Sequence, residues 1–167
     1  MSETFVSHLD WSGAAKGATH DPATFSRDLE LTLGGMTLPL SSAPAYRGDA
    51  SRLNPEQLLV GALSACQALT YLFLAARKQV IVVGYVDEAE GTLEMVDGRV
   101  RMSRVTLRPR ITLEGVADEP EAGPLVERAR ELVAKAHNGC FIANSVTSNV
   151  EIEPTFVFSE AAVRTAP

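Results

Sequence analysis

The fold is decided by one long apolar stretch, Asn54-Pro55-Glu56-Gln57-Leu58-Leu59-Val60-Gly61-Ala62-Leu63-Ser64-Ala65-Cys66-Gln67-Ala68-Leu69-Thr70-Tyr71. Asn54 suits the N-cap of a helix, and Pro55 suits the first helical position. Glu56 complements the helix dipole, and Gln57 can complete a capping box with Asn54. We therefore predict a helix that begins at Asn54 and ends near Arg77-Lys78, where cationic side chains match the negative helix end.

This helix is apolar on nearly all sides. A bilayer span needs about 20 predominantly apolar residues, and residues 58–76 approach that length. Gly61, Ser64, Gln67 and Thr70 interrupt the stretch, however, and no second span follows. Because such a helix can equally lie inside protein, we interpret it as a central helix, partly covered by a second subunit, and expect no membrane partner.

Both cysteines of the chain are associated with helices. Cys66 lies in the apolar helix, and Cys140 follows an amphipathic stretch at 125–136 and the polar helix end His137-Asn138-Gly139. Gly139 suits a C-terminal cap, which places Cys140 just beyond the second helix. A free cysteine usually packs as a small hydrophobe, but two thiols tied to helix positions of this kind favour redox chemistry.

The remaining segments predict strands. Alternation and turn signals place strands at 5–11, 25–33, 36–40, 80–95, 100–113 and 147–158. Asp97-Gly98 predicts a tight hairpin turn, and a shift of apolar parity near Ser103-Arg104 predicts a bulge. The order of three strands, helix, two strands, helix and strand, with strands in hairpins next to helices, indicates an α+β domain and not a doubly wound sheet.

Arg27 falls on the apolar parity of the predicted strand at 25–33. An arginine that faces inward needs a carboxylate, a ligand or water, because an unpaired buried charge is costly. Arg27 is therefore a candidate functional residue, and a structural ion pair or a strand-end position turned to solvent are the alternatives.

Length and charge narrow the class of protein. The 167 residues suit one domain, 1–167, with its core at about 5–158. A net charge of -6 without a basic cluster argues against a nucleic-acid partner. The N-terminus lacks a signal-peptide pattern and two cysteines are too few for a disulfide scaffold, so we expect a cytoplasmic protein. His8, His20, His137 and the cysteines match no usual zinc spacing, and we predict no metal or cofactor.

Two motifs resemble those of the OsmC/Ohr family, the osmotically induced and organic-hydroperoxide-resistance proteins. The first runs from Asn54 to Leu59 and continues through Ala62 to Ser64-Ala65-Cys66. The second is Ala136-His137-Asn138-Gly139-Cys140. With the order of elements, the resemblance covers roughly residues 5 to 158.

The resemblance implies an OsmC-like fold, in which antiparallel sheets pack around two central helices, and an intertwined homodimer. It also implies reduction of organic hydroperoxides by paired cysteines. By position, Cys66 would be the peroxidatic cysteine, Cys140 the resolving cysteine, and Glu56 the carboxylate that orients an arginine. An external thiol or dithiol would be the reductant. The pocket walls would come from four apolar residues, Leu63, Leu69, Tyr71 and Phe141, each of which can equally be ordinary core.

This chain departs from the family pattern at two positions. Lys16 stands where the family usually has its arginine, and a lysine does not reproduce the bidentate fork of a guanidinium. Arg27 is the first candidate to take the place of the family's arginine, and Arg47 is the second. Phe141 stands where peroxidase members commonly have proline. A non-catalytic dimer that binds a ligand or acts in stress response is therefore the alternative function.

The spacing of Glu56 and Cys66 suggests how the two subunits contribute to one site. Ten residues separate them, which is about 15 Å on a straight helix. We therefore expect Glu56 and its arginine to come from one subunit and Cys66 from the other.

Overall fold

The computed structural model describes residues 2–115 and 120–159, and it divides into two compact units. The first unit ends at Leu59 and the second begins at Val60, so the boundary falls in the first turns of helix α1 (Pro55–Arg77). The expectation of a single domain stays a prediction. The element types are those of the expected α+β class.

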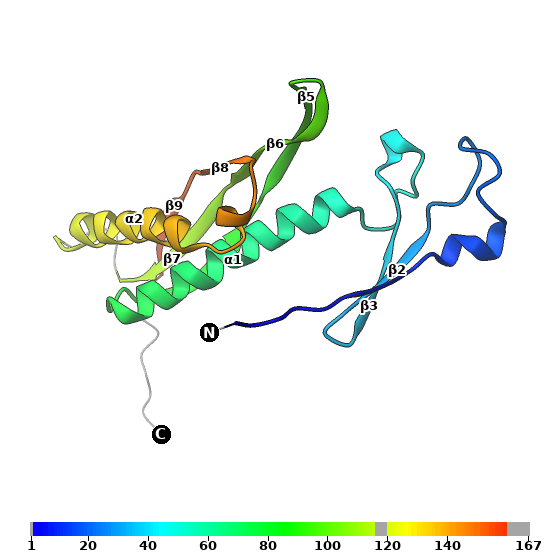
Figure 1. The fold of residues 1–167 in the computed structure, drawn as a ribbon. Helices are drawn as coiled ribbons and strands as arrows, with labels where there is room; N and C mark the ends of the chain where they lie inside the picture. Colours follow the sequence, from blue (N-terminus) through cyan, green and yellow to red (C-terminus); the bar gives the residue numbers. More distant parts are fainter. Residues whose placement is uncertain (1, 116–119, 160–167) are drawn as a thin grey trace. The chain divides into compact units, whose positions relative to one another are not determined.

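The first unit contains a three-stranded antiparallel sheet in the order β1-β2-β3 (Figure 1). Its strands are β1 (His8–Asp10), β2 (Leu29–Leu33) and β3 (Met36–Leu40). Gly34 and Gly35 form the turn between β2 and β3, with φ of 54° and 83°. Two short 3-10 helices, η1 (Ser12–Lys16) and η2 (Pro44–Tyr46), lie in the connections.

The strand predicted at 25–33 differs from the observed one. It begins only at Leu29, and Asp28 just before it is buried whereas Leu33 at its end is exposed. The carboxylate of Asp28 accepts a hydrogen bond from Lys16 at 2.6 Å and lies 3.9 Å from the guanidinium of Arg52. These two cations offset the cost of burying the charge, which an alternation pattern cannot reveal.

Helix α1 has the predicted bounds and the predicted capping box. The N–H of Gln57 donates to Oδ1 of Asn54 at 2.9 Å, and the N–H of Asn54 donates to Oε1 of Gln57 at 3.0 Å. Two backbone groups that a helix start leaves without partners are thereby satisfied.

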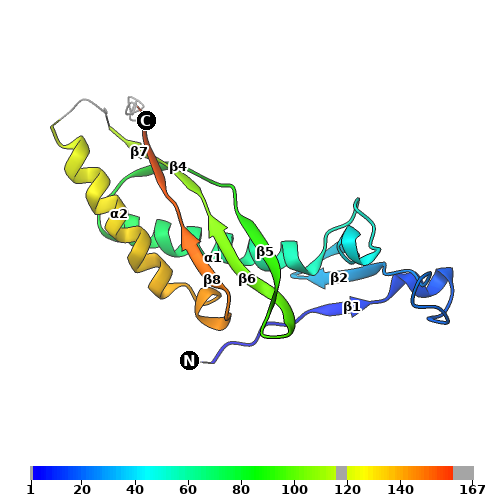
Figure 2. The same cartoon turned by 90° about the horizontal axis from the view of Figure 1, so that it is seen from above.

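The second unit holds two mixed three-stranded sheets beside α1 and α2 (Ala122–Gly139), which Figure 2 shows from above. One sheet has the order β4-β7-β9, from Val82–Asp87, Pro109–Glu114 and Thr155–Ser159. The other has the order β5-β6-β8, from Glu90–Val96, Arg99–Leu107 and Asn149–Ile152. The pairs β4-β7 and β5-β6 are antiparallel, as expected, and the pairs β6-β8 and β7-β9 are parallel, so each sheet is mixed.

The three long strands predicted in this unit were also wrong, because each divides into two strands that belong to different sheets. The breaks lie at 88–89, at Arg108 and at 153–154. At the second break the N–H of Arg108 donates to Oδ1 of Asp87 at 2.7 Å, and the next residue, Pro109, has no N–H. The backbone N–H of Arg108 is bound by a side chain, and Pro109 has no N–H to donate. The chain can therefore leave one sheet here and enter the other.

The hairpin turn and the bulge were predicted correctly. Asp97 and Gly98 have φ of 51° and 76°, the left-handed values of a tight hairpin turn. The β5-β6 register passes from Thr92↔Arg104 to Leu93↔Met102, which leaves Ser103 as the extra residue. Helix α2 begins at Ala122, earlier than expected, and accommodates Pro124 in its first turn, where backbone N–H groups have no partner within the helix.

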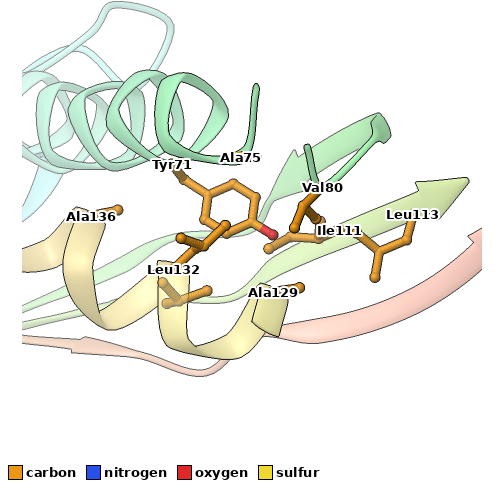
Figure 3. Close-up of a cluster of buried hydrophobic side chains, with 9 residues drawn as sticks. Tyr71, Ala75, Val80, Ile111, Leu113, Ala129, Leu132 and Ala136 are labelled. Carbon is orange, nitrogen blue, oxygen red and sulfur yellow. The ribbon is translucent and has the colours of Figure 1, made fainter. Parts of the chain in front are cut away.

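The core of the second unit lies where α1, α2 and β7 meet. Figure 3 shows Tyr71 of α1 between Leu132 of α2 and Ile111 of β7, with small alanines on both helices. Ala75, Ala129 and Ala136 are almost fully buried in this cluster.

Outside this contact α1 stays apolar but exposed. By length and composition alone it could cross a membrane, the one helix of the described chain that could. Leu69 and Phe73 have 71% and 59% of their surface exposed, and Leu72 is exposed as well.

Candidate functional site: a hydrogen-bonded thiol pair

The two cysteines lie together in the second unit. Cys66 is in the middle of α1 and half-buried, and Cys140 is the C-cap residue of α2 and buried. Both are free thiols, and they are hydrogen-bonded to each other. The helix packing that builds the core therefore also brings together two residues 74 positions apart in the sequence.

The sulfur of Cys66 accepts hydrogen bonds from the Cys140 thiol and from the backbone N–H groups of Phe141 and Ile142. Thr70 also lies within reach of this sulfur. Its hydroxyl donates to the carbonyl oxygen of Cys66 at 2.9 Å, however. Since a hydroxyl has one proton to donate, we regard Cys140 and the two amides as the effective donors.

These donors stabilise the thiolate of Cys66. Burial alone raises the pKa of the Cys66 thiol, because it disfavours the charged form. The hydrogen bonds from Cys140, Ile142 and Phe141 favour the charged form, and their sum holds the pKa of Cys66 below its ordinary value. Cys66 is therefore the better nucleophile at neutral pH, because the thiolate is the reactive species.

Cys140 behaves in the opposite way. Its burial, the hydrogen bond it shares with Cys66 and the charge on Cys66 together raise the pKa of the Cys140 thiol. The N–H of Ala143 donates to Sγ of Cys140 at 3.4 Å and opposes part of this shift. Cys140 therefore keeps its proton to a higher pH than Cys66 does.

A tight turn after α2 positions these donors. The N–H of Asn144 donates to the carbonyl of Cys140 at 3.0 Å, and the Ser145 hydroxyl donates to the carbonyl of Phe141 at 2.7 Å. The Asn144 side-chain amide donates to the carbonyl of Asn138 at 3.1 Å. The segment 140–145 is therefore fixed by its own hydrogen bonds and not only by its contact with Cys66.

Gly139 has a different role from the predicted one. It is the last residue of α2 and does not have the left-handed φ of a glycine cap. A Cβ at this position would lie 3.4 Å from Cγ2 of Thr70 on α1. The end of α2 therefore lies against α1 next to Cys66, with Thr70 as its neighbour.

Glu56, the predicted orienting carboxylate, lies in the first turn of α1 and belongs to the first unit. Its Oε2 is buried and has no hydrogen-bond partner among the described residues. A buried carboxylate oxygen without a donor is costly, so this atom is ready to accept a hydrogen bond from a cation. The prediction that Glu56 acts on Cys66 stays a prediction.

The basic candidates also belong to the first unit. Arg27 donates to the carbonyls of Phe25 and Pro22 at 3.0 and 2.8 Å, and its guanidinium lies 4.3 Å from the centre of the Phe25 ring. Lys16 pairs with Asp28. Arg47 is exposed and is the left-handed residue that ends η2. None of these contacts tests which cation activates Cys66.

Sequence reasoning missed Arg52, which has more carboxylate partners than the three candidates. It lies 3.2 Å from Glu30 and 3.9 Å from both Asp28 and Asp49. Little in the sequence indicated this cluster, because its acidic residues are far apart in the chain. Glu30 lies in β2, Asp28 lies just before that strand, and Asp49 lies in a loop. The amides of Phe141 and Ile142 were also missed, because backbone donors leave no trace in the identity of a residue.

The predicted pocket walls separate into two groups. Leu63 and Tyr71 are fully buried core residues, whereas Leu69 and Phe141 are exposed. Burial raises the pKa of Tyr71 to about 12. Among the described residues no group of three or more histidine, cysteine or acidic side chains could hold a metal ion.

Comparison with known proteins agrees with the two motifs. A family model described as OsmC-like protein matches residues 48–155. An uncharacterised protein of Bacillus subtilis (strain 168), YmaD, is 24% identical over 120 residues, which are 72% of this chain and 77% of that protein.

Solved structures share the fold. An OsmC-like protein of unknown function from Vibrio cholerae has 28% identity and a TM-score of 0.80, over 93% of this chain and 100% of that one. An organic hydroperoxide resistance protein OsmC from Legionella pneumophila has 19% identity and a TM-score of 0.61, over 92% and 96%. The two helices and mixed sheets are thus the architecture of these proteins.

Proposed function

Because the chain belongs to the OsmC-like protein family, we propose that it is a thiol-dependent peroxidase that reduces organic hydroperoxides, with Cys66 as the peroxidatic and Cys140 as the resolving cysteine. The observation that carries the proposal is the hydrogen bond between the two thiols, which lowers the pKa of Cys66 and raises that of Cys140. The name of the Legionella pneumophila relative, an organic hydroperoxide resistance protein, agrees with it.

In the first step the Cys66 thiolate attacks the terminal oxygen of the hydroperoxide. An S–O bond forms and the O–O bond breaks, so the sulfur is oxidised to a sulfenic acid and the peroxide is reduced to an alcohol. The departing alkoxide takes up a proton. The sulfur of Cys66 must therefore be a negatively charged thiolate before this step, and it loses that charge when it becomes a sulfenic acid.

Loss of that charge prepares the second step. The thiolate of Cys66 and its hydrogen bond both raise the pKa of Cys140, and neither acts once Cys66 is a sulfenic acid. Cys140 then ionises more easily and attacks the Cys66 sulfur. An S–S bond forms and water leaves. An external thiol or dithiol reduces the disulfide by exchange and is itself oxidised, and no metal or other cofactor takes part.

A cation supplied across a homodimer completes the proposed site. Glu56 has a buried carboxylate oxygen without a described partner, which supports a role in orienting an arginine. Arg27 is the first candidate, and Lys16 and Arg47 are the others. With Glu56 and the cation from one subunit and Cys66 from the other, the site would form only in the dimer.

Exposed apolar side chains on α1 support the dimer. Leu69, Leu72 and Phe73 follow one another along the helix and are all exposed in the single chain. A second copy of the chain that covers them would remove apolar surface from water at about 25 cal/mol per Å². Leu69 and Phe141, both exposed, would then serve as walls for an apolar hydroperoxide.

The free thiols suit a reducing compartment, and we place the protein in the cytoplasm. With a net charge of -6, the partners we propose are a second copy, the peroxide and the reductant, and neither nucleic acid nor membrane. The alternative function, a non-catalytic ligand-binding or stress-response dimer, is favoured by the local engagement of Arg27 with Pro22 and Phe25.

The test is consumption of cumene hydroperoxide with a dihydrolipoyl or a monothiol donor. We expect Cys66→Ser to abolish turnover, whereas Cys140→Ser should lose turnover with the dithiol and accumulate a sulfenic acid at Cys66. Arg27→Ala is compared with Arg99→Ala, which removes an exposed arginine from the β5-β6 hairpin. An unchanged free-thiol count in the peroxide-treated wild type would contradict the proposal and favour the alternative function.

A further inference from the structure

We infer that the groove between α2 and β8 binds a small carboxylate with an apolar body, held by Arg130 and His137. Figure 2 shows these two elements side by side, and residues of both line the groove. Neither cysteine is among the lining residues. The site is therefore separate from the thiol pair and does not rest on the proposed peroxidase function.

The groove has the size and the walls of a site for a small molecule. Its volume is about 290 Å³. A water molecule takes up about 30 Å³ in the liquid, so the groove has room for a ligand of about ten non-hydrogen atoms. Most of its lining is apolar, as is usual for sites of this kind. The apolar walls are Val133 and Ala134 of α2, Val150 and Ile152 of β8, and Pro154 beyond β8.

The two polar side chains of the groove set the charge of its ligand. Arg130 and His137 are seven residues apart on α2, which places them on one face of the helix. None of the described residues that line the groove is acidic. A ligand therefore meets the permanent positive charge of an arginine with no carboxylate in the lining to offset it, and the planar fork of a guanidinium suits a carboxylate.

The guanidinium of Arg130 is oriented but has room for a ligand. It lies 5.3 Å from the centre of the Phe156 ring, a contact that favours a cation. Its Nε lies 3.9 Å from Oε1 of Glu127, which is too far for a hydrogen bond. Among the described residues Arg130 has no side-chain hydrogen bond. Its N–H groups are therefore available to a carboxylate.

His137 supplies the second polar group. Its Nδ1 is buried and has no hydrogen-bond partner, and in the part of the chain that the structure describes the ring makes no other hydrogen bond. A buried polar group without a partner is costly. Because no protein group competes for this ring, an N–H of His137 can donate to a ligand oxygen.

The first test compares two probes that share an apolar chain, hexanoate and the uncharged 1-hexanol. Each is titrated into the ¹⁵N-labelled full chain, and binding is followed by the movement of amide signals. We expect hexanoate to shift the signals of Ala134, His137 and Ile152 and to leave that of Gly98 in the distant β5-β6 turn unchanged. Hexanoate should bind about tenfold more tightly than hexanol, because its hydrogen bonds are charge-assisted. Equal affinities, or no response at the groove, would overturn the inference.

The second test removes the charge of Arg130. Arg130→Met should weaken hexanoate binding about tenfold and leave hexanol binding unchanged. Lys135→Met is the matched control, because Lys135 lies in the same helix and also pairs with a glutamate, Glu131, at 3.2 Å, but does not line the groove. Equal hexanoate affinities in these two variants would contradict a role for Arg130.

The third test fills the groove. Ala134 is exposed and lines it, so Ala134→Leu should occupy the space without disturbing the core, and leucine suits a helix. Both probes should lose binding in this variant. His137→Phe keeps a flat ring without its nitrogens and should weaken hexanoate binding several-fold. Hexanoate that still binds to Ala134→Leu with wild-type affinity would place its site elsewhere and refute the proposed groove.

Discussion

The thiol of Cys140 is hydrogen-bonded to the sulfur of Cys66, and the pKa values of the two residues are shifted in opposite directions. The contact between the two cysteines thereby makes Cys66 the easier thiol to ionise and Cys140 the harder one. Neither residue type nor helix position separates the two cysteines in this way, because each lies at or within a helix and each is shielded from water.

The first prediction concerns the order in which the cysteines react. The lowered pKa of Cys66 makes its thiolate appear first as pH rises, and the raised pKa of Cys140 delays the second thiolate. Alkylation of Cys66 should therefore have its midpoint at a lower pH than alkylation of Cys140. Preferential labelling of Cys140 at neutral pH, followed on the two peptides by mass spectrometry, would contradict the division of roles.

The second prediction concerns Gly139. In Gly139→Val the new side chain meets Thr70, since even a Cβ would lie 3.4 Å from its Cγ2. The Cys140 turn should move away from α1, and peroxide-induced disulfide formation should slow about tenfold or more. Gly123→Val is the matched control, because Gly123 lies in the same helix with nothing within 4 Å of an added Cβ. Equal rates in the two variants would show that the close approach is not required.

The third prediction concerns the core of the second unit. Leu132 is 3% exposed and packs among α1, α2 and β7. Leu132→Ala should lower the free energy of unfolding by about 2–5 kcal/mol, the usual cost of removing a buried leucine side chain and leaving a cavity. The measurement is urea denaturation, with Val100→Ala as control, because Val100 is 52% exposed and its truncation should cost under about 0.5 kcal/mol.

The fourth prediction concerns acid stability. The hydrogen bond from Lys16, opposed by burial, holds the pKa of Asp28 below its ordinary value. A carboxyl whose pKa is lower in the folded state stabilises the fold above its unfolded pKa of about 3.9, and this stability is lost as pH falls through the folded pKa. Lys16→Met should therefore reduce stability near neutral pH and weaken its dependence on pH below about 4.

Lys135→Met is the control for this acid titration. It removes one lysine from an exposed ion pair, in which Nζ lies 3.2 Å from Glu131, and exposed pairs contribute little. An acid-unfolding curve of Lys16→Met that coincides with the curve of Lys135→Met would mean that Asp28 does not depend on Lys16.

The fifth prediction concerns assembly. If a second copy covers the exposed apolar side chains of α1, Phe73→Glu should weaken the dimer, because burial of an unpaired charge is costly. Sedimentation should show a wild-type species of twice the 17.9 kDa chain mass and a lighter variant. Val100→Glu introduces the same charge on the β5-β6 hairpin as a control. A wild type that sediments as a monomer at micromolar concentration would contradict the proposed homodimer.

Local signals in the sequence were sufficient for several features. The capping box of Asn54 and Gln57, the Asp97-Gly98 turn and the bulge at Ser103 depend on residues close together in the chain, and each was predicted correctly. The alternation pattern was less reliable. It could not show that residues 80–95 form two strands of different sheets. Near the end of the first of these strands, the side chain of Asp87 accepts a hydrogen bond from the backbone N–H of Arg108, a residue distant in the sequence.

By itself, the sequence determined the helices, the tight turns and the family to which the chain belongs, since these depend on local propensity and short motifs. Only the tertiary structure decided how the two cysteines differ. Burial, one shared hydrogen bond and two backbone N–H groups set their pKa values in opposite directions. Each of these depends on how the end of α2 packs against the middle of α1, and backbone donors are common to nearly all residues, so no pattern of side chains could have revealed them.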